Sequence, residues 1–416
     1  MEEVLIHKLV HGGQGLGELS DGRKVFVWNA LPGEKVKAHI VKQKRSYAEA
    51  IAEEILEKSA ERVEPKEENH LATSPWQVLN FESENKYKLE IVQELFAHEK
   101  VNLPKVSGVI TDGSEWHYRN KMEYSFWGDD AGLHLALHRR GSHGKQIVKG
   151  SKLAMPVIDT AANAICIQLD KLQIRAGDLK TIIVRCSQRG DVVASLFVKP
   201  TRFQKLELPK ELKGLRVYHS NPKSPASVTT QLLYELGEPL LQDELLGKQF
   251  TYDVDSFFQV NIPVFELALA RISEHCSESF ITDMYAGVGS IGLSVASKSV
   301  DLVELDPATA KMAGLNAAAS SLKTQVIETS TEKALDFITT DKPVIFDPPR
   351  AGLHDKVVER VLEAKPPKVI YLSCNPATQA RDLGKLQTSY KIEFFEVYNF
   401  FPQTPHIETL AVLKYS

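Results

Sequence analysis

A glycine-rich loop between a short apolar strand and a helix constrains the fold of this chain more than any other feature. The stretch FITDMYAGVGSIGLSVAS (residues 280–297) reads as strand, loop and helix, and Gly287, Gly289 and Gly292 satisfy the GxGxxG spacing. The pattern repeats in DLVELDPATAKMAGLNAAAS, and the apolar strands VIFDPP, KVIYLSC and FEVYNFF follow. Alternating strands and helices predict a doubly wound α/β domain over residues 251–416, with its ligand at the carboxyl ends of the strands.

The residues around this loop indicate which ligand to expect. Glycines let the backbone approach a ligand closely, and Glu304 ends the second strand, where an acid often binds ribose hydroxyls. The loop alone does not separate a dinucleotide from S-adenosylmethionine, and a purely structural glycine turn is a further alternative. Asp347 opens a strand-end DPPR in which consecutive prolines fix the backbone. This feature is common in methyltransferases that act on nitrogen or nucleobases and unnecessary in dehydrogenases, so we predict a Rossmann-like methyltransferase domain.

Two candidate catalytic residues come after later strands. Cys374 lies where the apolar strand KVIYL runs into a polar Asn–Pro turn, a place where a thiol can be exposed and activated as a nucleophile. A small buried hydrophobe is the plainer interpretation of a cysteine, and it fits the other three, Cys166, Cys186 and Cys276. Glu408 precedes the last strand after a proline-fixed loop and is a candidate general base. His406 competes for that role, and a plain surface charge is the alternative.

The first 60 residues predict a small all-β barrel, because short apolar runs alternate with glycine turns. Several basic residues would lie along one strand pair and its loop: Lys35, Lys37, Lys42, Lys44 and Arg45. A basic face on a small barrel suits a phosphate backbone, whereas a solvated edge strand guarded by lysines is the equal alternative.

The mixture of strand-like and helical stretches in residues 61–250 predicts an α+β domain. A helix near 83–100 is a candidate to pack on the catalytic domain. The stretches HYRNKMEYSF and LALHRRGSHGKQIV interleave cations, Arg119 and Lys121 among them, with aromatic side chains. Cations between aromatics suit RNA, whose bases stack and whose phosphates pair with charge. Strands with one charged face are the alternative.

Composition restricts the class of protein. The chain has 416 residues, 43% hydrophobic and 25% charged, which is typical of a globular protein with two or three domains. The first residues lack an apolar signal region and no stretch suits a bilayer, so we expect a cytoplasmic protein without membrane contact. Four scattered cysteines without a CxxC pair predict neither disulfides nor a metal site. A net charge of -4 argues against non-specific coating of nucleic acid but not against a local basic groove.

Taken together, these motifs resemble the RNA 5-methyluridine methyltransferase family. SFFQVN, DMYAGVGSIG, VELDP, VIFDPPRAGL, YLSCNPAT and FPQTPHIETLAVL cover the catalytic domain in order. The N-terminal unit resembles the TRAM domain, an OB-like RNA-binding barrel, and HYRNKMEYSF resembles a motif of the central domain. The resemblance implies that Cys374 adds to carbon 6 of a uracil and that Glu408 removes the proton from carbon 5. It also implies S-adenosylmethionine contacts at Gln259, Tyr285, Gly287, Gly289, Ser290, Glu304 and Asp347. For RNA, we expect contacts at Arg119, Lys121, Arg350, Lys35 and Lys37.

The chain departs from this family at one segment. Many members hold an iron–sulfur cluster on central cysteines, but the matching segment NHLATSPWQVLNF has Trp76 and Gln77 and no cysteine, so we predict no cluster. Within the family a TRAM-like barrel accompanies enzymes of large-subunit ribosomal RNA more often, which favours 23S rRNA over the tRNA T-loop. Three different functions compete with uracil methylation: an NAD-dependent oxidoreductase, a catalytically silent RNA-binding protein and a methyltransferase of exocyclic nitrogen. We expect a monomer.

Overall fold

The chain forms two compact units that interleave along the sequence. The computed structural model describes residues 1–141, 144–224, 227–276 and 278–416. The first unit comprises Met1–Tyr87, Ser114–Pro239 and Phe401–Pro405. The second comprises Lys88–Gly113, Leu240–Phe400 and His406–Ser416. The first unit thus holds both the N-terminal barrel and the sheet of the middle region, and the division into three domains at residues 60 and 250 stays a prediction.

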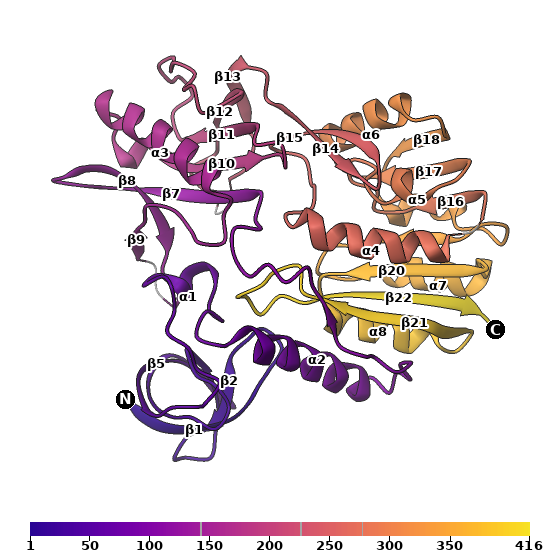
Figure 1. Ribbon diagram of the computed structural model, residues 1–416, viewed down its shortest axis with the longest axis horizontal. Helices are drawn as coiled ribbons and strands as arrows, with labels where there is room; N and C mark the ends of the chain where they lie inside the picture. Colours follow the sequence, from indigo (N-terminus) through magenta and orange to yellow (C-terminus); the bar gives the residue numbers. More distant parts are fainter. Residues whose placement is uncertain (142–143, 225–226, 277) are drawn as a thin grey trace. The chain divides into compact units, whose positions relative to one another are not determined.

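The N-terminal barrel is a closed five-stranded sheet (Figure 1). Its strands, in spatial order, are β1 (Glu2–Leu9), β2 (Gly15–Glu18), β3 (Lys24–Trp28), β5 (Tyr47–Glu57) and β4 (Lys35–Gln43). Pairing of β4 with β1 closes the barrel, which removes unpaired strand edges. Inward positions carry small and β-branched side chains, and Val25, Val27 and Ala50 are wholly buried. The predicted OB-like barrel is confirmed.

A buried ion pair ties the end of this barrel to the segment that follows it. Glu34 is fully buried, and its carboxylate accepts hydrogen bonds from the Arg62 guanidinium at 2.6 and 2.8 Å. The same carboxylate accepts the N–H groups of Leu31 and Ser59. Because both oxygens are satisfied, the charge is well compensated in its buried position.

The middle region forms a seven-stranded sheet with one helix packed on it. The strands run in the order β13 (Gln231–Gly237), β12 (Gly214–His219), β11 (Val192–Val198), β10 (Leu179–Cys186), β7 (Lys121–Asp129), β8 (Gly132–His138) and β9 (Lys145–Ile147). Helix α3 (Pro156–Lys171) buries Ile158, Ile165 and Leu169 in the core of this α+β region. Two short elements accompany it, α1 (His70–Thr73) and the 3-10 turn η1 (Ala176–Asp178).

The second unit is built on an eight-stranded sheet. Its strands run in the order β18 (Lys323–Glu328), β17 (Ser299–Glu304), β16 (Phe280–Asp283), β19 (Val344–Phe346), β20 (Lys368–Ser373), β22 (Glu408–Tyr415), β21 (Tyr390–Tyr398) and β6 (Val109–Ile110). Neighbours from β18 to β20 are parallel, whereas β22 is antiparallel to both β20 and β21. The predicted doubly wound α/β domain is confirmed.

Helices and a hairpin complete the second unit. They are the hairpin β14 (Leu240–Leu245) and β15 (Lys248–Asp253), the helices α4 (Ile262–His275), α5 (Gly292–Val295), α6 (Pro307–Ala319), α7 (Asp355–Ala364) and α8 (Pro376–Leu386), and the 3-10 turns η2 (Thr331–Lys333) and η3 (Leu335–Phe337). Helix α2 (Phe81–His98) ends in this unit, where the Phe96 ring lies 4.9 Å from that of Phe395 on β21. Within the described ranges, no helix has the length and apolar character needed to cross a membrane.

Just before its last strand, the second unit is interrupted by a short segment that belongs to the first unit. Phe401–Pro405 belongs to the first unit, where hydrogen bonds hold it on several sides. The N–H of Gln403 donates to the Glu84 carboxylate at 2.9 Å, and its carbonyl accepts the Trp76 N–H at 3.2 Å. Tyr118 donates its hydroxyl to the carbonyl of Pro402 at 3.0 Å. Gln403 is buried with a φ of 64°, a left-handed conformation that non-glycine residues adopt only where the surroundings enforce it.

Candidate active site

The candidate residues of the second unit gather at the carboxyl ends of its parallel strands. The order of the strands reverses between β16 and β19, and ligands of doubly wound sheets bind at such a switch point. Asp283 ends β16, Glu304 ends β17, Asp347 directly follows β19 and Cys374 directly follows β20. The structure therefore brings the glycine loop, two predicted cofactor acids and the predicted nucleophile to one edge of the sheet.

The glycine loop packs against the sheet too closely for side chains. Gly289 has a φ of 86°, and a Cβ there would lie 2.7 Å from Cδ1 of Leu293. A Cβ on Gly292 would lie 2.8 Å from Cδ2 of Leu302. The N–H of Gly287 donates to Oε2 of Glu304 at 2.9 Å, so the predicted ribose-binding acid already contacts the loop. The half-buried Ser290 lies in the same loop.

Asp283 is a site residue that the sequence motifs did not single out. Its side chain is fully buried, and Oδ2 accepts the N–H of Gly292 at 2.9 Å. Its other oxygen, Oδ1, is buried without a hydrogen bond to any part of the chain that the structure describes. Burial raises the pKa of this carboxyl to about 7. The acid at the end of the strand before the glycine loop was visible in the sequence, but its burial was not.

The acids of this pocket fit a cationic ligand. Burial and, to a smaller extent, the nearby Asp283 carboxylate raise the pKa of Asp347 to about 7. Glu304 acts in the same direction on the pKa of Asp283. S-adenosylmethionine carries a sulfonium and an ammonium group, which would relieve this crowding of negative charge. The unpartnered oxygen of Asp283 and the glycine loop therefore fit the predicted cofactor.

The loop before α4 carries another predicted cofactor contact. Gln259 is buried there, while the neighbouring Phe258 stacks on Tyr252 with ring centroids 4.1 Å apart and anchors the loop. Phe257, in contrast, is 63% exposed, and a Cβ on Gly287 would lie 3.8 Å from its carbonyl. An exposed phenylalanine beside the glycine loop is a second site feature that sequence reasoning missed.

Tyr285 is the remaining predicted cofactor contact. It directly follows the buried Met284 after β16 and is half-buried, with its ring 6.4 Å from that of Phe346. Burial raises the pKa of its hydroxyl to about 12, so the group is a neutral donor at physiological pH.

The pairing of β20 with β22 brings Cys374 and Glu408 together. Ser373 lies opposite Thr409 in the last pair of these antiparallel strands, and Cys374 and Glu408 are the next residues on the two chains. Glu408 is near enough to raise the pKa of the Cys374 thiol. Residues that face each other in antiparallel strands have Cα atoms about 4.5–5.5 Å apart. Cys374 is half-buried and Glu408 is only 2% exposed.

Burial and neighbouring carboxylates disfavour the ionised forms of both groups. Burial raises the pKa of the Cys374 thiol to about 12, and the carboxylates of Glu408 and Asp347 act in the same direction. Burial also raises the pKa of Glu408 well above its ordinary value, and Asp347 adds to this effect. The Arg350 guanidinium lowers the pKa of both groups. If Cys374 is the nucleophile, its thiol therefore needs activation, and the raised pKa of Glu408 fits the predicted role in proton transfer.

Hydrogen bonds behind the strands fix these two residues. Gln379 on α8 donates Nε2 to the carbonyl of Tyr371 at 2.8 Å, and its Oε1 accepts the Thr409 hydroxyl at 2.8 Å. This amide therefore bridges β20 and β22 close to Cys374 and Glu408. Asn375 caps α8 and donates Nδ2 to the carbonyl of Arg350 at 2.8 Å.

A buried acid holds the proline loop against α8. Asp382 accepts hydrogen bonds from the N–H of Leu353 at 2.8 Å and from the hydroxyl of Tyr371 at 2.9 Å. A Cβ on Gly352 would lie 2.7 Å from the Asp382 carboxylate, so this approach requires glycine. Neither Asp382 nor Gln379 stood out in the sequence, because each supports the site only through residues distant along the chain.

His406 and Arg350 contact each other near Cys374 and Glu408. Nη2 of the exposed Arg350 is 3.4 Å from Nδ1 of His406. The structure thus associates the competing base candidate with a cation, whereas it places Glu408 opposite Cys374.

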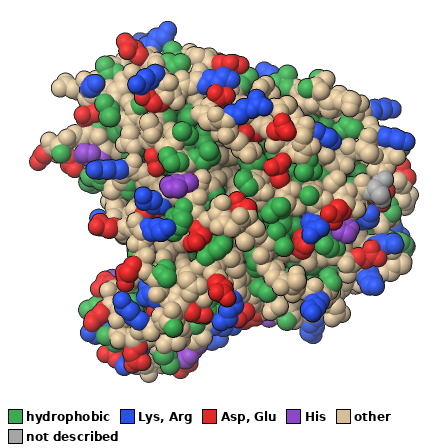
Figure 2. Space-filling view, in the orientation of Figure 1, with side chains coloured by type: hydrophobic (Ala, Val, Ile, Leu, Met, Phe, Trp, Pro, Cys, Tyr) green, Lys and Arg blue, Asp and Glu red, His purple; other side chains and the backbone are tan. Residues whose placement is uncertain are grey.

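The other residues predicted to contact RNA belong to the first unit. Lys35 and Lys37 point outward from β4, and each forms an exposed ion pair, with Glu3 and Glu54 respectively, at 2.8 Å. Figure 2 likewise shows basic and acidic side chains interspersed over the barrel. Arg119 has a buried Nε that makes no hydrogen bond within the described ranges, and Lys121 begins β7. Their contacts with RNA stay predictions, and the acidic partners reduce the net charge of the barrel face.

Hydrogen bonds organise the segment in which the family resemblance would place cysteines. Gln77 donates Nε2 to the Glu67 carboxylate and to the Ser74 hydroxyl, both at 2.7 Å, and its Oε1 accepts the Lys66 N–H at 3.0 Å. Trp76 donates its ring N–H to the carbonyl of Gly13 at 3.0 Å. Among the described residues, no group of three or more potential His, Cys, Asp or Glu ligands could hold a metal ion.

Comparisons with known proteins identify relatives of this chain. Residues 335–415 match the family model of tRNA (uracil-5-)-methyltransferases, and residues 1–52 match the TRAM domain. The chain is 30% identical to a protein of Lactiplantibacillus plantarum named an uncharacterized RNA methyltransferase, over 99% of this chain and 96% of the relative. A relative of the same description from Thermotoga maritima is 27% identical over 99% of both chains.

A solved structure shares the fold over nearly the whole chain. The tRNA (uracil-54, C5)-methyltransferase of Pyrococcus abyssi, solved with S-adenosyl-L-homocysteine, superposes with a TM-score of 0.78 at 22% identity and covers 99% of this chain and 100% of its own. Fold and comparisons define an S-adenosylmethionine-dependent methyltransferase fold with an RNA-binding TRAM domain. The chain belongs to the RNA (uracil-5-)-methyltransferase family, which removes the oxidoreductase alternative.

Proposed function

We propose that this protein transfers a methyl group from S-adenosylmethionine to carbon 5 of a uridine in RNA, with 23S rRNA as the favoured substrate. Cys374 acts as the nucleophile and Glu408 as the general base. The observation that carries the proposal is the register that sets Cys374 opposite the buried Glu408, at the strand ends beside the glycine loop. A methyltransferase of exocyclic nitrogen would need neither residue in this arrangement.

The chemistry explains why a thiol is needed. Carbon 5 of uracil is a poor nucleophile, and the addition of the Cys374 thiolate to carbon 6 pushes the ring electrons toward O4 as an enolate. Carbon 5 then becomes nucleophilic enough to take a methyl group. When S-adenosylmethionine is bound, it supplies this electrophilic methyl. After the transfer, carbon 5 carries both the methyl group and its original proton.

Glu408 completes the reaction. Its carboxylate removes the proton from carbon 5, the electron pair re-forms the C5–C6 double bond, and the C6–sulfur bond breaks to release the thiolate. A base works best when its pKa lies near the working pH, and burial moves the pKa of Glu408 upward from its ordinary range. Arg350 favours the ionised forms of both groups. The target base must leave its stack to reach this site, so a flipped or single-stranded uridine is expected.

Two RNAs are candidate substrates. A TRAM-like barrel favours 23S rRNA within the family. The Pyrococcus abyssi tRNA enzyme nevertheless matches this chain over its full length, barrel included, so the barrel does not by itself select ribosomal RNA. The T-loop uridine of tRNA is therefore the second candidate substrate.

Substrate trapping tests the chemistry and the RNA together. 5-Fluorouridine-substituted 23S rRNA and tRNA are each incubated with S-adenosylmethionine and wild-type protein, Cys374→Ala or Cys276→Ala. Fluorine at carbon 5 cannot leave as a proton, so we expect a stable protein–RNA adduct with wild type and with Cys276→Ala, whose lost thiol is buried. Cys374→Ala should form none, and the RNA that is trapped identifies the substrate. If neither RNA is trapped although the cofactor binds, the proposal is wrong and nitrogen methylation or silent RNA binding is favoured.

A second variant tests the base. Glu408→Gln keeps the shape of the side chain but cannot take the proton from carbon 5. With ordinary uridine RNA we expect this variant to accumulate the methylated covalent adduct, detected by mass spectrometry, while His406→Gln still turns over. Normal turnover by Glu408→Gln would show that another group is the base.

A further inference from the structure

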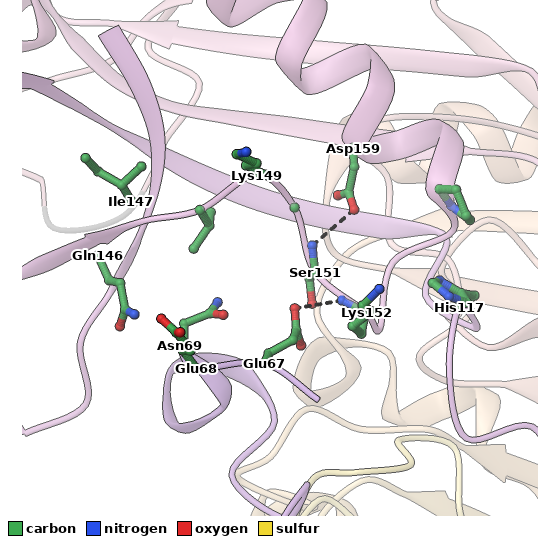
Figure 3. A pocket seen from close by; sticks show the side chains of 13 residues that line it. Glu67, Glu68, Asn69, His117, Gln146, Ile147, Lys149, Ser151, Lys152 and Asp159 are labelled. Carbon is green, nitrogen blue, oxygen red and sulfur yellow. Dashed lines mark hydrogen bonds between the residues drawn. The ribbon is translucent and has the colours of Figure 1, made fainter. Parts of the chain in front are cut away.

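A hollow of about 570 Å³ lies in the first unit, apart from the residues assigned to methyl transfer (Figure 3). Its wall comes from residues 67–69, from residues 146–152 at the end of the edge strand β9, and from Pro156 and Asp159 at the start of α3, with His117 alongside. The volume falls within the range of about 300–1,000 Å³ typical of small-ligand sites. One nucleotide would fit.

Hydrogen bonds make part of this wall rigid. Oδ2 of Asp159 accepts the N–H of Ser151 at 3.1 Å, and Oε1 of Glu67 accepts the N–H of Lys152 at 2.8 Å, as Figure 3 shows. A Cβ on Gly150 would lie 2.1 Å from the Asp159 carboxylate, so only glycine allows this close approach. The hollow is therefore a built feature of the fold with acceptor oxygens fixed in its wall.

Two further polar residues of the lining keep hydrogen-bonding capacity that the described chain does not use. Asn69 is the N-cap residue of α1, but its side chain makes no capping hydrogen bond. Its Nδ2 is buried and makes no hydrogen bond with the described part of the chain. His117 adopts a left-handed φ of 56°, a strained conformation that tends to occur at functional sites. Its Nδ1 donates to the carbonyl of Ala154 at 2.9 Å, which leaves Nε2 as the acceptor of the neutral ring.

The lining residues also define what kind of ligand fits. Ile147 is 45% exposed and, with Val148 and Pro156, offers apolar surface to a flat ring. Acidic side chains at three positions oppose a phosphate inside the hollow: Glu67, Glu68 and Asp159. The exposed Lys149 and Lys152 at the rim can meet phosphates outside it. Carboxylates and amides in such a setting accept from the exocyclic amino groups of bases.

We propose that this hollow binds one unstacked base of the RNA, other than the methylated uridine, and that the base carries an exocyclic amino group, as cytosine, adenine and guanine do. Glu68, which takes no part in the wall hydrogen bonds described above, accepts from the amino group, and Asn69 donates to a ring nitrogen or carbonyl. Lys149 and Lys152 hold the flanking phosphates. Uracil presents a carbonyl where cytosine has its amino group and is rejected by the carboxylate. The inference rests on the proposed RNA substrate and adds a second recognition point to it.

Binding of two short RNAs to the full-length protein tests this assignment. Fluorescein-labelled oligo(C) and oligo(U) of equal length are titrated with wild type, Glu68→Gln, Asn69→Ala and Lys149→Glu, with fluorescence anisotropy as the readout. Wild type should bind oligo(C) roughly 10-fold more tightly than oligo(U). Glu68→Gln and Asn69→Ala should reduce that preference to near unity, because the discriminating contacts are lost. Lys149→Glu should weaken both RNAs alike and lower the slope of log affinity against log salt by about 1.

The control makes the same charge reversal at a lysine outside the lining of the hollow. Lys171→Glu alters an exposed lysine at the far end of the 16-residue helix α3, about 22 Å from Pro156, and should leave the affinity for both RNAs unchanged. Thermal unfolding of each variant shows that the fold is intact. The assignment is overturned if wild type binds both RNAs equally, or if Glu68→Gln and Asn69→Ala keep the full preference.

The same preparations separate this inference from the proposed function. A protein that transfers no methyl group to 23S rRNA or tRNA, yet loses its oligo(C) preference in Glu68→Gln, contradicts the proposed function and retains the second site. If wild type transfers methyl groups but the variants of the hollow bind both RNAs as wild type does, the proposed function stands and the second site is contradicted.

Discussion

Occupation of the cofactor site should make the thiol of Cys374 more reactive through charge alone. In the free protein the pKa of this thiol is raised to about 12, which leaves roughly one group in ten thousand ionised at pH 8. S-adenosylmethionine brings a sulfonium charge to the strand ends, whereas S-adenosylhomocysteine fills the same site without it. The two ligands therefore differ by one positive charge near the nucleophile.

The size of the effect follows from the geometry that methyl transfer requires. The thiol must approach carbon 6 and the methyl group of the sulfonium must approach the adjacent carbon 5, each across a reacting distance of about 3–3.5 Å. At a separation of about 7 Å and an effective dielectric constant of about 20, one charge stabilises the thiolate by about 2 kcal/mol. This energy corresponds to a roughly 30-fold larger ionised fraction, because each 1.36 kcal/mol is about one pKa unit.

Alkylation by iodoacetamide at pH 8, followed by mass spectrometry of the Cys374 peptide, measures this fraction. We expect slow labelling of the free protein, little change with S-adenosylhomocysteine and a roughly 30-fold acceleration with S-adenosylmethionine. Sinefungin, which carries an amino group where the sulfonium stands, should also accelerate labelling. The buried thiols of Cys166, Cys186 and Cys276 provide internal references. Equal labelling rates with the two adenosyl ligands, or labelling of the free protein as fast as an ordinary thiol, would refute the electrostatic reasoning.

The charges and contacts described above lead to four more predictions. Because the carboxyls of Asp283 and Asp347 have pKa values near 7, affinity for the cationic cofactor should rise between about pH 6 and 8 and then level off, whereas affinity for S-adenosylhomocysteine should change less in calorimetric titrations. Glu34→Ala leaves a buried arginine uncompensated and should lower the free energy of unfolding by about 3–5 kcal/mol in denaturant titrations. Charge reversal at Lys35 and Lys37 should weaken RNA binding and flatten its salt dependence, and unchanged affinity would identify them as a solvated strand face. Purified protein should show no visible iron-linked absorbance, and stoichiometric iron would contradict the predicted absence of a cluster.

Local patterns in the sequence predicted the architecture, and contacts distant along the chain explain what they missed. The glycine turns were sufficient to predict the barrel, and the alternation of strands and helices was sufficient to predict the doubly wound sheet. Cys374 and Glu408 could each be proposed from a strand end. What brings the two strand ends together is the insertion of β22 between β20 and β21, which no local pattern in the sequence predicts.

The remaining differences have the same physical origin. Glu3 and Glu54, which pair with the barrel lysines, come close only because β4 pairs with both β1 and β5. Asp283 reads as an ordinary strand residue until packing buries it. The two-residue strand β6 is too short to leave any periodic pattern in the sequence.

The excursion of Phe401–Pro405 into the first unit limits how this protein can be divided or recombined. These five residues end just before the strand that begins with Glu408, and their hydrogen-bond partners belong to the RNA-binding side of the chain. No single cut yields a catalytic fragment that retains them together with their partners. A graft of this catalytic domain onto another RNA-binding module would therefore separate the proposed base from the contacts that hold its loop, so the two units are expected to be inherited and engineered as one piece.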